Sequence, residues 1–329
     1  MPTLRQLRYL DALARFRHFG HAAEHCAVTQ PALSTQIQQL ERKLGIELVE
    51  RGHNSVRLTA AGREIAQRAA RVLSEVRDLG DYARHHARLL SGDLRLGVIP
   101  TIAPYLLPPL LPKLRKRYPD LDLHIRETQT QTLLDELADG ALDVILAALP
   151  LDHADIETMA LFEDRFVLAM PIRRRMKSFT RATPELLKHD RLLLLEEGHC
   201  LRDQALSFCE LRQADNIDTF GASSLSTIVQ MVANGLGLTL LPELSIDVEA
   251  RHGEIRLMRF IEPEPSRIVG LAWRSSSPRK RDFTTLGKLI AASVPGRRRL
   301  LNTEANASGA GRKSPARFRA KRPAVRKVT

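Results

Sequence analysis

Residues 21–45 read HAAEHCAVTQPALSTQIQQLERKLG, two short amphipathic segments joined by a turn. In the second segment the apolar residues recur at the spacing of one helical face; they are Leu33, Ile37, Leu40 and Leu44. Pro31 lies in the first turn of this helix, where proline is tolerated, and Gly45 is placed to stop it. A helix over residues 21–26, a turn at Val28-Thr29 and a helix from Gln30 onward predict a helix-turn-helix.

The flanking sequence extends this unit to a winged helix-turn-helix over residues 1–58. Residues 4–17 predict a preceding helix that ends at Phe19-Gly20, and residues 48–59 alternate around the turn cluster 52–54 as a small β-wing does. We expect the third helix to lie in the major groove of DNA, with the wing beside it. The candidate DNA contacts are Arg5, Gln30, Pro31, Ser34, Thr35, Gln36, Arg51 and Arg57. The same pattern also fits a helical subdomain whose polar face is only solvated.

Residues 59–91 predict one long linker helix. Its apolar residues are spaced alternately by four and three positions, which is a heptad seam and favours an intermolecular coiled coil; they are Ile65, Ala69, Val72, Val76, Leu79 and Ala83. We therefore expect a homodimer formed through residues 59–90, because a helix-turn-helix usually reads two half-sites. The alternative is a long helix that packs on its own domain.

Residues 92–295 predict an α/β regulatory domain in two lobes with mostly parallel sheets. The expected strands are residues 94–99, 121–127, 142–149, 166–170, 192–195, 239–241 and 268–273, and the expected helices are residues 106–117, 132–139, 225–234 and 279–293. Ligands of such folds bind near the carboxyl ends of strands, where Pro100-Thr101 and Thr128–Thr130 lie. The sequence shows no glycine-rich phosphate loop, no metal-ligand spacing and no Ser-His-Asp arrangement, so we expect neither a metal nor a cofactor.

Positive charge is concentrated at the two ends of the chain. The 329 residues carry a net charge of +12, with +5 in residues 1–90, −3 in residues 91–295 and +10 in residues 296–329. Basic ends favour a polyanionic partner, most often nucleic acid. Residues 296–329 contain too little apolar material for a core and predict a disordered tail, which either adds non-specific DNA affinity or only solvates the chain.

The cysteines and the N-terminus indicate the compartment. Three cysteines are too few for a secreted disulfide framework, and neither a signal peptide nor a membrane-spanning run is visible. The sequence therefore predicts a cytoplasmic protein without membrane contact. Two of the cysteines lie close together, in the run from Gly198-His199-Cys200 to Cys209.

These two cysteines are candidates for redox chemistry. A thiol reacts as thiolate, which nearby cationic groups favour, and a second cysteine in a flexible segment is typical of a resolving thiol. The alternative is that Cys200 and Cys209 are small buried apolar residues. Cys26, on the apolar face of the second helix, is expected to be such a core residue.

Several runs resemble the LysR-type transcriptional regulators: VTQPALS at residues 28–34, LERKLG at residues 40–45, Glu50-Arg51, and LTAAG at residues 58–62. The resemblance covers about residues 4–295. It implies a winged helix-turn-helix, a long linker helix and a two-lobed α/β effector domain like a periplasmic binding protein, whose chain returns to the first lobe near residue 267. It also implies a homotetramer and contact with RNA polymerase. One departure is Val49, where the family usually has phenylalanine.

Within that family the regulatory half resembles the members that sense hydrogen peroxide. The resemblance rests on GVIPT at residues 97–101, PYLLP at residues 104–108, Gln129-Thr130, EEGHCLRDQA at residues 196–205, Phe208-Cys209 and Arg267. It implies that Cys200 is the peroxidatic cysteine and Cys209 the resolving one. It also implies that the residues which hold peroxide or tune the thiolate are Thr101, Thr130, His199, Asp203 and Arg267.

The implied disulfide has a structural consequence. If residues 200–209 include a helix, nine residues place the two Cα atoms roughly 13 Å apart, whereas a disulfide needs them within about 7 Å. Oxidation therefore requires this segment to unwind. The sequence thus predicts a non-enzymatic, peroxide-switched regulator. Two alternatives stay open: a LysR-type regulator of a small organic effector bound between the lobes, and a thiol peroxidase.

Overall fold

The computed structural model describes residues 1–51, 56–85, 88–173, 181–183, 185–188, 190–208, 217–251 and 253–294. The tip of the predicted wing, Cys209 and the basic tail lie outside these residues. Within them, the structure contains no helix with the length and apolar character needed to cross a membrane.

The N-terminal part is a winged helix-turn-helix. Its elements are α1 Leu4–Phe16, α2 Phe19–His25, α3 Gln30–Leu44, β1 Val49–Arg51 and β2 Val56–Leu58. Gly45 ends α3 in the left-handed conformation (φ 71°), as its position predicted. Phe19 begins α2 instead of ending the preceding helix, because the His18 side chain caps the new helix by accepting from Gly20 N.

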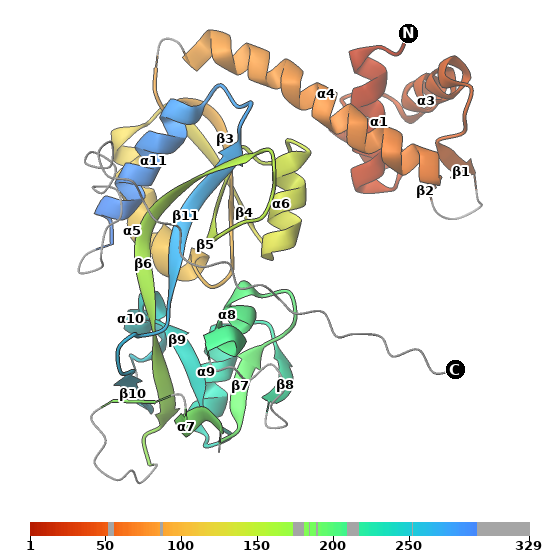
Figure 1. The fold of residues 1–329 in the computed structure, drawn as a ribbon. Helices are drawn as coiled ribbons and strands as arrows, with labels where there is room; N and C mark the ends of the chain where they lie inside the picture. Colours follow the sequence, from red (N-terminus) through yellow and green to blue (C-terminus); the bar gives the residue numbers. More distant parts are fainter. Residues whose placement is uncertain are drawn as a thin grey trace, which may run out of the picture.

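The heptad seam runs along helix α4, Ala60–His85, and the first and later parts of this seam have different surroundings. Ala69 is buried and Ile65 packs against the core of the winged helix-turn-helix, so this end of the seam is covered by its own domain. Val72, Val76 and Leu79 are exposed, Leu79 at 77 %. Figure 1 shows α4 leading from the winged helix-turn-helix across one side of the first lobe. The seam is thus free for a partner only along its later part.

The regulatory half folds into two lobes, each with its own apolar core. Lobe I holds β3 Gly92–Val98, α5 Ala103–Arg117, β4 Leu121–Glu127, α6 Thr130–Ala138, β5 Val144–Leu149 and α11 Lys280–Ala292. Lobe II holds α7 Glu185–Lys188, β7 Leu192–Leu195, α8 Cys200–Phe208, β8 Ile217–Ala222, α9 Leu225–Ala233, β9 Thr239–Pro242, η1 Glu243–Ser245, α10 Ile246–Glu249 and β10 Ile255–Arg259.

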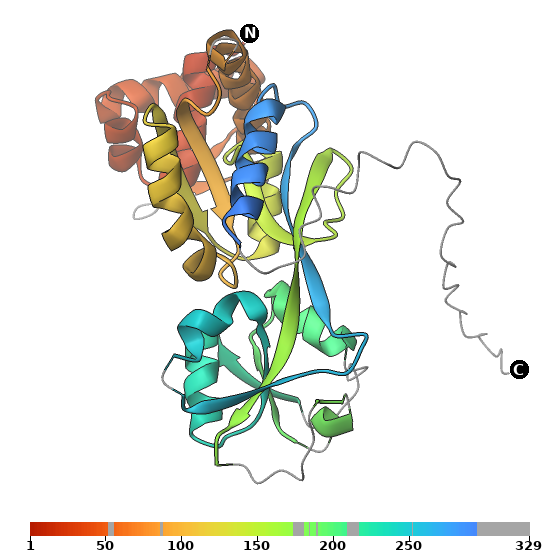
Figure 2. The same ribbon diagram turned by 90° about the vertical axis from the view of Figure 1, so that its left-hand side faces the viewer.

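Two strands, β6 Ile156–Pro171 and β11 Ser266–Arg274, connect the lobes (Figures 1 and 2). The sheet order is β10-β6-β11-β5-β3-β4, with β9 also paired to β6. The prediction of mostly parallel sheets is wrong for this sheet: β4 and β5 pair with β3 in parallel, whereas every pair that involves β6 or β11 is antiparallel. The reason is that β6 leads the chain out of lobe I and β11 brings it back alongside.

A polar contact also joins the lobes. The hydroxyl of Tyr105 on α5 donates to Glu249 Oε1 at the end of α10, at 2.7 Å. Tyr105 packs against both apolar cores, and its burial raises the pKa of the phenol far above its ordinary value. The tyrosine therefore stays protonated and keeps donating across the lobe boundary.

Candidate functional site

The candidate site is a narrow cavity at the beginning of α8. It is lined by three segments that the fold brings together from the end of β3, the start of α6 and the loop after β7: Ile99, Pro100, Thr101, Gln129, Thr130, Gly198, His199 and Cys200. Cys200 has a free thiol and packs against the core of lobe I, although it belongs to a lobe II helix. The side chains that line this cavity pack closely and leave no room for a water molecule, so a ligand enters only if these side chains move.

Cys200 is the first residue of α8, so its thiol lies beside the unpaired amides of a helix N-terminus, where negative charge is stabilised. The preceding loop turns sharply at Gly198, whose φ is +91°. A Cβ there would approach Gln129 Oε1 to 2.5 Å. Gln129 Nε2 also donates to Glu197 O at 3.3 Å, which ties the start of α6 to this loop.

Arg267 braces one wall of the cavity. Its Nη1 donates to Thr101 Oγ1 at 2.8 Å and its Nη2 to Thr101 O at 3.0 Å. The guanidinium also pairs with Asp164 Oδ2 at 3.0 Å, and both side chains are 0 % exposed. Because Thr101 Oγ1 accepts from Arg267, its own hydroxyl proton is left to donate elsewhere.

Thr130 contributes a second hydroxyl to the cavity. Its Oγ1 is buried and has no hydrogen-bond partner. Buried polar atoms are rarely left unpaired, because the lost hydration is not replaced. A small hydrogen-bonding ligand in the cavity removes this deficit.

The other predicted residues of the site lie at different depths. His199 is buried, and its Nε2 lies 3.8 Å from Glu196 Oε1. Asp203 is exposed on α8 and does not line the cavity, because it lies one helical turn beyond Cys200. Cys209 lies outside the described residues. The structure therefore gathers Cys200, Thr101, Thr130, His199 and, through Thr101, Arg267.

Sequence reasoning missed Asp164, the partner of Arg267. The two residues are 103 positions apart and become neighbours only through the register of β6 and β11, which pairs them directly. A local signal did exist. Asp164 alternates with Phe162 and Phe166, which are both buried, so period-two alternation places this carboxylate on the apolar face of its strand.

The predicted DNA-contacting residues cluster around the start of α3. Gln30, Pro31 and Thr35 are exposed, and Ser34 and Gln36 are partly exposed. Gln36 Oε1 also accepts from Gln6 Nε2 at 3.2 Å, so this residue helps hold α3 against α1. The remaining candidates are Arg5, exposed on α1, Arg57, exposed on β2, and Arg51, which belongs to β1 but whose side chain lies outside the described part.

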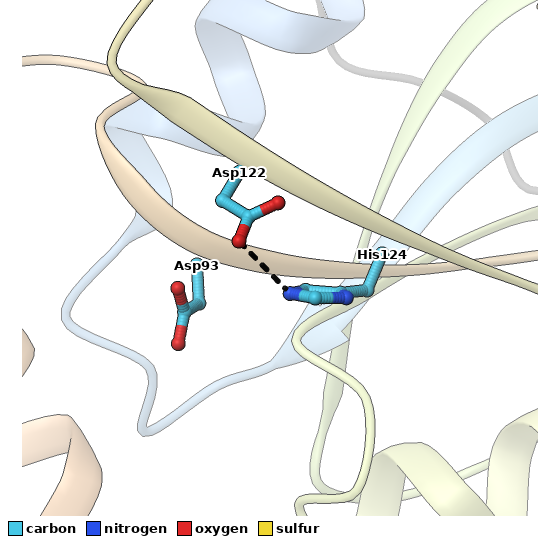
Figure 3. A group of neighbouring side chains, drawn as sticks. All are labelled: Asp93, Asp122 and His124. Atoms are coloured by element: carbon cyan, nitrogen blue, oxygen red, sulfur yellow. Dashed lines mark ion pairs between the residues drawn. The ribbon is translucent and has the colours of Figure 1, made fainter.

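One group of potential cation ligands outside the cavity escaped the sequence analysis. The parallel register of β3 and β4 places Asp93 beside Asp122, and His124 Nε2 lies 3.5 Å from Asp122 Oδ2 (Figure 3). All three side chains are exposed. Exposed acidic groups are common without a bound ion, so this group by itself does not indicate a metal site.

Comparison with known proteins agrees with this architecture. Residues 4–63 match the family of bacterial regulatory helix-turn-helix proteins of the lysR type, and residues 87–294 match the LysR substrate binding domain. A probable hydrogen peroxide-inducible genes activator of Streptomyces viridosporus is 44% identical over 295 residues, which cover 89% of this chain and 95% of that protein. The DNA-binding transcriptional dual regulator OxyR of Escherichia coli K12 is 40% identical over 294 residues, covering 89% and 96%.

Among solved structures, a full-length OxyR variant from Pseudomonas aeruginosa superposes with a TM-score of 0.76 at 39% identity, covering 90% of this chain and 97% of that one. The resemblance seen in the sequence motifs thus extends over both the DNA-binding and the regulatory halves. By its sequence matches and its fold, this chain belongs to the LysR family of bacterial helix-turn-helix regulators.

Proposed function

We propose that this protein is a transcriptional activator that responds to hydrogen peroxide through Cys200. The observation that carries the proposal is the small cavity lined by Cys200, whose thiol is free, and by two threonines, one of which has a buried hydroxyl without a partner. The proposal is supported by relatives whose names describe them as activators of hydrogen peroxide-inducible genes. It needs no cofactor and no metal.

The proposed reaction is a two-step oxidation. The Cys200 thiolate attacks one oxygen of peroxide, an S–O bond forms as the O–O bond breaks, and the departing hydroxide takes up a proton as water. The hydroxyls of Thr101 and Thr130 orient the peroxide and donate to the leaving oxygen. The Cys209 thiol then attacks the oxidised sulfur, the S–O bond breaks, a second water leaves and a disulfide remains.

Arg267 acts through Thr101 in this mechanism. Its positive charge is already paired with Asp164, and its Nη1–H group occupies one lone pair of Thr101 Oγ1. The arginine thereby fixes the direction in which the Thr101 hydroxyl donates. His199, which is buried and directly precedes Cys200 in the chain, also lines the cavity.

Disulfide formation converts this chemistry into a conformational change. Helix α8 extends from Cys200 to Phe208. At about 1.5 Å per residue its two ends lie roughly 12 Å apart, and a disulfide needs Cα atoms within about 7 Å. Closing a bond from Cys200 to Cys209 therefore requires α8 to unwind, which is the two-state element that a switch needs.

The proposal extends to the partners of the protein. It binds double-stranded promoter DNA through α3 and the wing, forms a homodimer through residues 59–90 and a homotetramer, and contacts RNA polymerase in the cytoplasm. The exposed row of Val72, Val76 and Leu79 supports dimerisation, because three apolar side chains on one helix face gain from burial.

The test is mass spectrometry of the alkylated protein before and after one equivalent of peroxide. We expect Cys200 and Cys209 to become linked while Cys26 remains reduced, and Cys200→Ser to lose the peroxide-dependent change in DNA binding but keep basal binding. Cys209→Ser should stall at the sulfenic acid. A Cys200→Ser protein that still responds overturns the proposal, and repeated turnover with a thiol reductant would indicate a peroxidase instead. If both thiols stay reduced, a small organic effector becomes the better account.

A further inference from the structure

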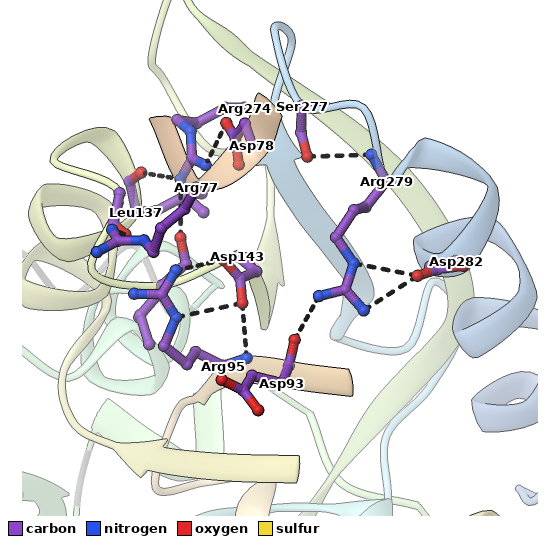
Figure 4. Close-up of polar contacts among 12 residues, drawn as sticks. Arg77, Asp78, Asp93, Arg95, Leu137, Asp143, Arg274, Ser277, Arg279 and Asp282 are labelled. Carbon is purple, nitrogen blue, oxygen red and sulfur yellow. Dashed lines mark hydrogen bonds and ion pairs between the residues drawn. The ribbon is translucent and has the colours of Figure 1, made fainter. Parts of the chain in front are cut away.

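The linker helix docks on lobe I through a small set of polar contacts (Figure 4). Arg77 on α4 is exposed, and its Nη2 donates to Gly140 O at 2.8 Å. Asp78, one residue further on, accepts from Arg274 Nη2 at 3.2 Å. The fit is close, since a Cβ on Gly140 would lie 2.0 Å from Ser74 Oγ. We call these contacts the dock.

Arg274 is the centre of the dock. Besides Asp78, its guanidinium holds two backbone carbonyls: Nη1 donates to Leu137 O at 3.0 Å and to Leu142 O at 2.8 Å. One side chain at the end of β11 therefore joins the last turn of α6, the loop before β5 and the linker helix. A shift of either α6 or β11 changes the environment of Asp78.

Both of these elements also reach the cavity at Cys200. Helix α6 begins with Thr130, which lines the cavity, and its last turn carries the Leu137 carbonyl that Arg274 binds. Strand β11 carries Arg267, which holds Thr101, near one end and Arg274 at the other. Two separate elements thus connect the same two places.

The buried polar atoms without a hydrogen-bond partner lie in the cavity, on α8 and at the dock. In the described part of the chain, four buried side-chain polar atoms have no hydrogen-bond partner: Thr130 Oγ1, Gln204 Oε1, Ser74 Oγ and Arg274 Nε. The first lies in the cavity, the second on α8, and the last two at the dock. Such atoms are costly in a rigid scaffold, and their concentration here fits elements that have a second arrangement with other partners.

We propose that the ion pair between Asp78 and Arg274 couples the redox state of the cavity to the linker helix. The proposal rests on the function proposed above and names its route of regulation. When α8 unwinds, α6 and β11 shift Arg274, and the buried Asp78 carboxylate follows its partner because leaving it unpaired is unfavourable. Helix α4 then moves with its DNA-binding domain.

The opposite face of α4 fits this role. At about 100° per residue, Ser74 and Asp78 project from one side of the helix, whereas Val72, Val76 and Leu79 project from the other. The dock therefore leaves the proposed dimer seam uncovered. A movement imposed at the dock changes how two DNA-binding domains are placed relative to each other across that seam.

The test compares Asp78→Asn with wild type and with Asp120→Asn, which removes the exposed ion pair to Arg88 away from the dock. Thiol alkylation measures the oxidation of Cys200 by peroxide. The operator affinity is measured for the reduced and the oxidised proteins. We expect normal Cys200 oxidation in all three. The ratio of the two affinities should fall at least about fivefold in Asp78→Asn, with Asp120→Asn like wild type. A wild-type ratio in Asp78→Asn, at equal thermal stability, overturns the coupling.

Two further measurements keep the outcome decisive. Gly140→Ala, which pushes against Ser74, should reduce the affinity ratio in the same way, so it replaces Asp78→Asn if that variant is unstable. Linkage is reciprocal. In the wild-type protein, operator DNA must therefore shift the equilibrium between Cys200 and glutathione by the same factor as oxidation changes the operator affinity. A redox equilibrium that does not change when operator DNA is added contradicts the coupling. Failure of Cys200 to oxidise in wild type would instead contradict the proposed sensor.

Discussion

At the scale of single residues, the two threonines of the cavity have the same hydroxyl but different surroundings. Thr101 Oγ1 accepts from Arg267, whereas Thr130 Oγ1 is buried and has no partner. If Thr130 serves only for packing, its replacement by valine should raise the stability of the protein. If Thr130 binds a ligand, the same replacement should lower the reactivity of the site. The two roles are therefore separable by measurement.

Thr130→Val should slow oxidation of Cys200 by peroxide at least about tenfold, because one donor to the leaving oxygen is removed. The same change should leave stability unchanged or raise it by about 1 kcal/mol, since an unpaired buried hydroxyl is removed. Thr101→Val should slow oxidation and also lower the free energy of unfolding by about 1–3 kcal/mol, because Arg267 Nη1 loses its acceptor. Stopped-flow oxidation and urea unfolding decide this. A Thr130→Val protein oxidised at the wild-type rate removes that hydroxyl from the mechanism.

At the scale of elements, α3 and α4 each have a face whose binding partner has to be identified, and the two faces differ in polarity. The outer face of α3 is polar, and such a face either contacts DNA or is only solvated. The seam of α4 is apolar, and its first part packs on the winged helix-turn-helix while its later part is exposed. Neither the polar face of α3 nor the apolar seam of α4 identifies its binding partner by itself, so each helix needs a binding measurement.

For α3, Ser34→Ala and Thr35→Ala should each weaken operator binding by about 1–3 kcal/mol, the value of one polar interaction with a base. Dimerisation should not change. Thr35 is the cleaner probe than Gln36, because Gln36 also holds Gln6 within the domain. Thr285→Ala on α11 is the control. Fluorescence anisotropy with operator DNA measures the effect, and unchanged affinity in both variants would assign base reading to another element.

For α4, Val76→Asp should weaken the dimer at least about tenfold, because a charge replaces an apolar side chain at the centre of the exposed seam. The matched control is Ile261→Asp, which places the same charge on another exposed apolar residue, between β10 and β11. Sedimentation velocity over a concentration series measures the dissociation constant. Equal dimerisation in Val76→Asp and wild type would mean that this helix face has no partner.

At the scale of the whole molecule, the basic ends bracket a nearly neutral regulatory domain. Residues 296–329, which lie outside the described part, carry a net charge of +10. If they lie along phosphates, truncation after Pro295 should weaken binding to operator and random DNA about equally. It should also flatten the log–log salt dependence by about 0.9 for each phosphate that the tail no longer neutralises. Salt titrations of both proteins test this, and an unchanged slope would show that the tail does not engage DNA.

The sequence predicted the parts of this fold that depend on local patterns. Helix α3 ends at Gly45 as its spacing and glycine indicated, and Leu121–Glu127 and Leu192–Leu195 are strands with the expected bounds. Pairing between distant strands was beyond local patterns. The length of β6 and the antiparallel return of β11 follow from chain crossing between lobes, which no short window of residues encodes.

The candidate site divides in the same way. The motif around Cys200 and the threonines at strand ends were visible in the sequence, and the structure brings Thr101, Thr130 and His199 to the thiol. Asp203, in the same motif, is exposed on α8 and is not among the residues that line the cavity. Asp164 and the dock at Arg274 come from pairings across more than a hundred residues, so only the folded chain reveals them.

Strand β11 also holds the only tryptophan of the chain, Trp273, one position before Arg274. Its indole is 5 % exposed, packs 5.5 Å from the ring of Phe283 and donates from Nε1 to Glu157 Oε2 at 3.2 Å. Indole emission depends on such surroundings of the ring, and no second tryptophan obscures the signal. The protein therefore has an intrinsic fluorescent probe on the strand that carries both Arg267 and Arg274, and its emission can be followed in real time without any label.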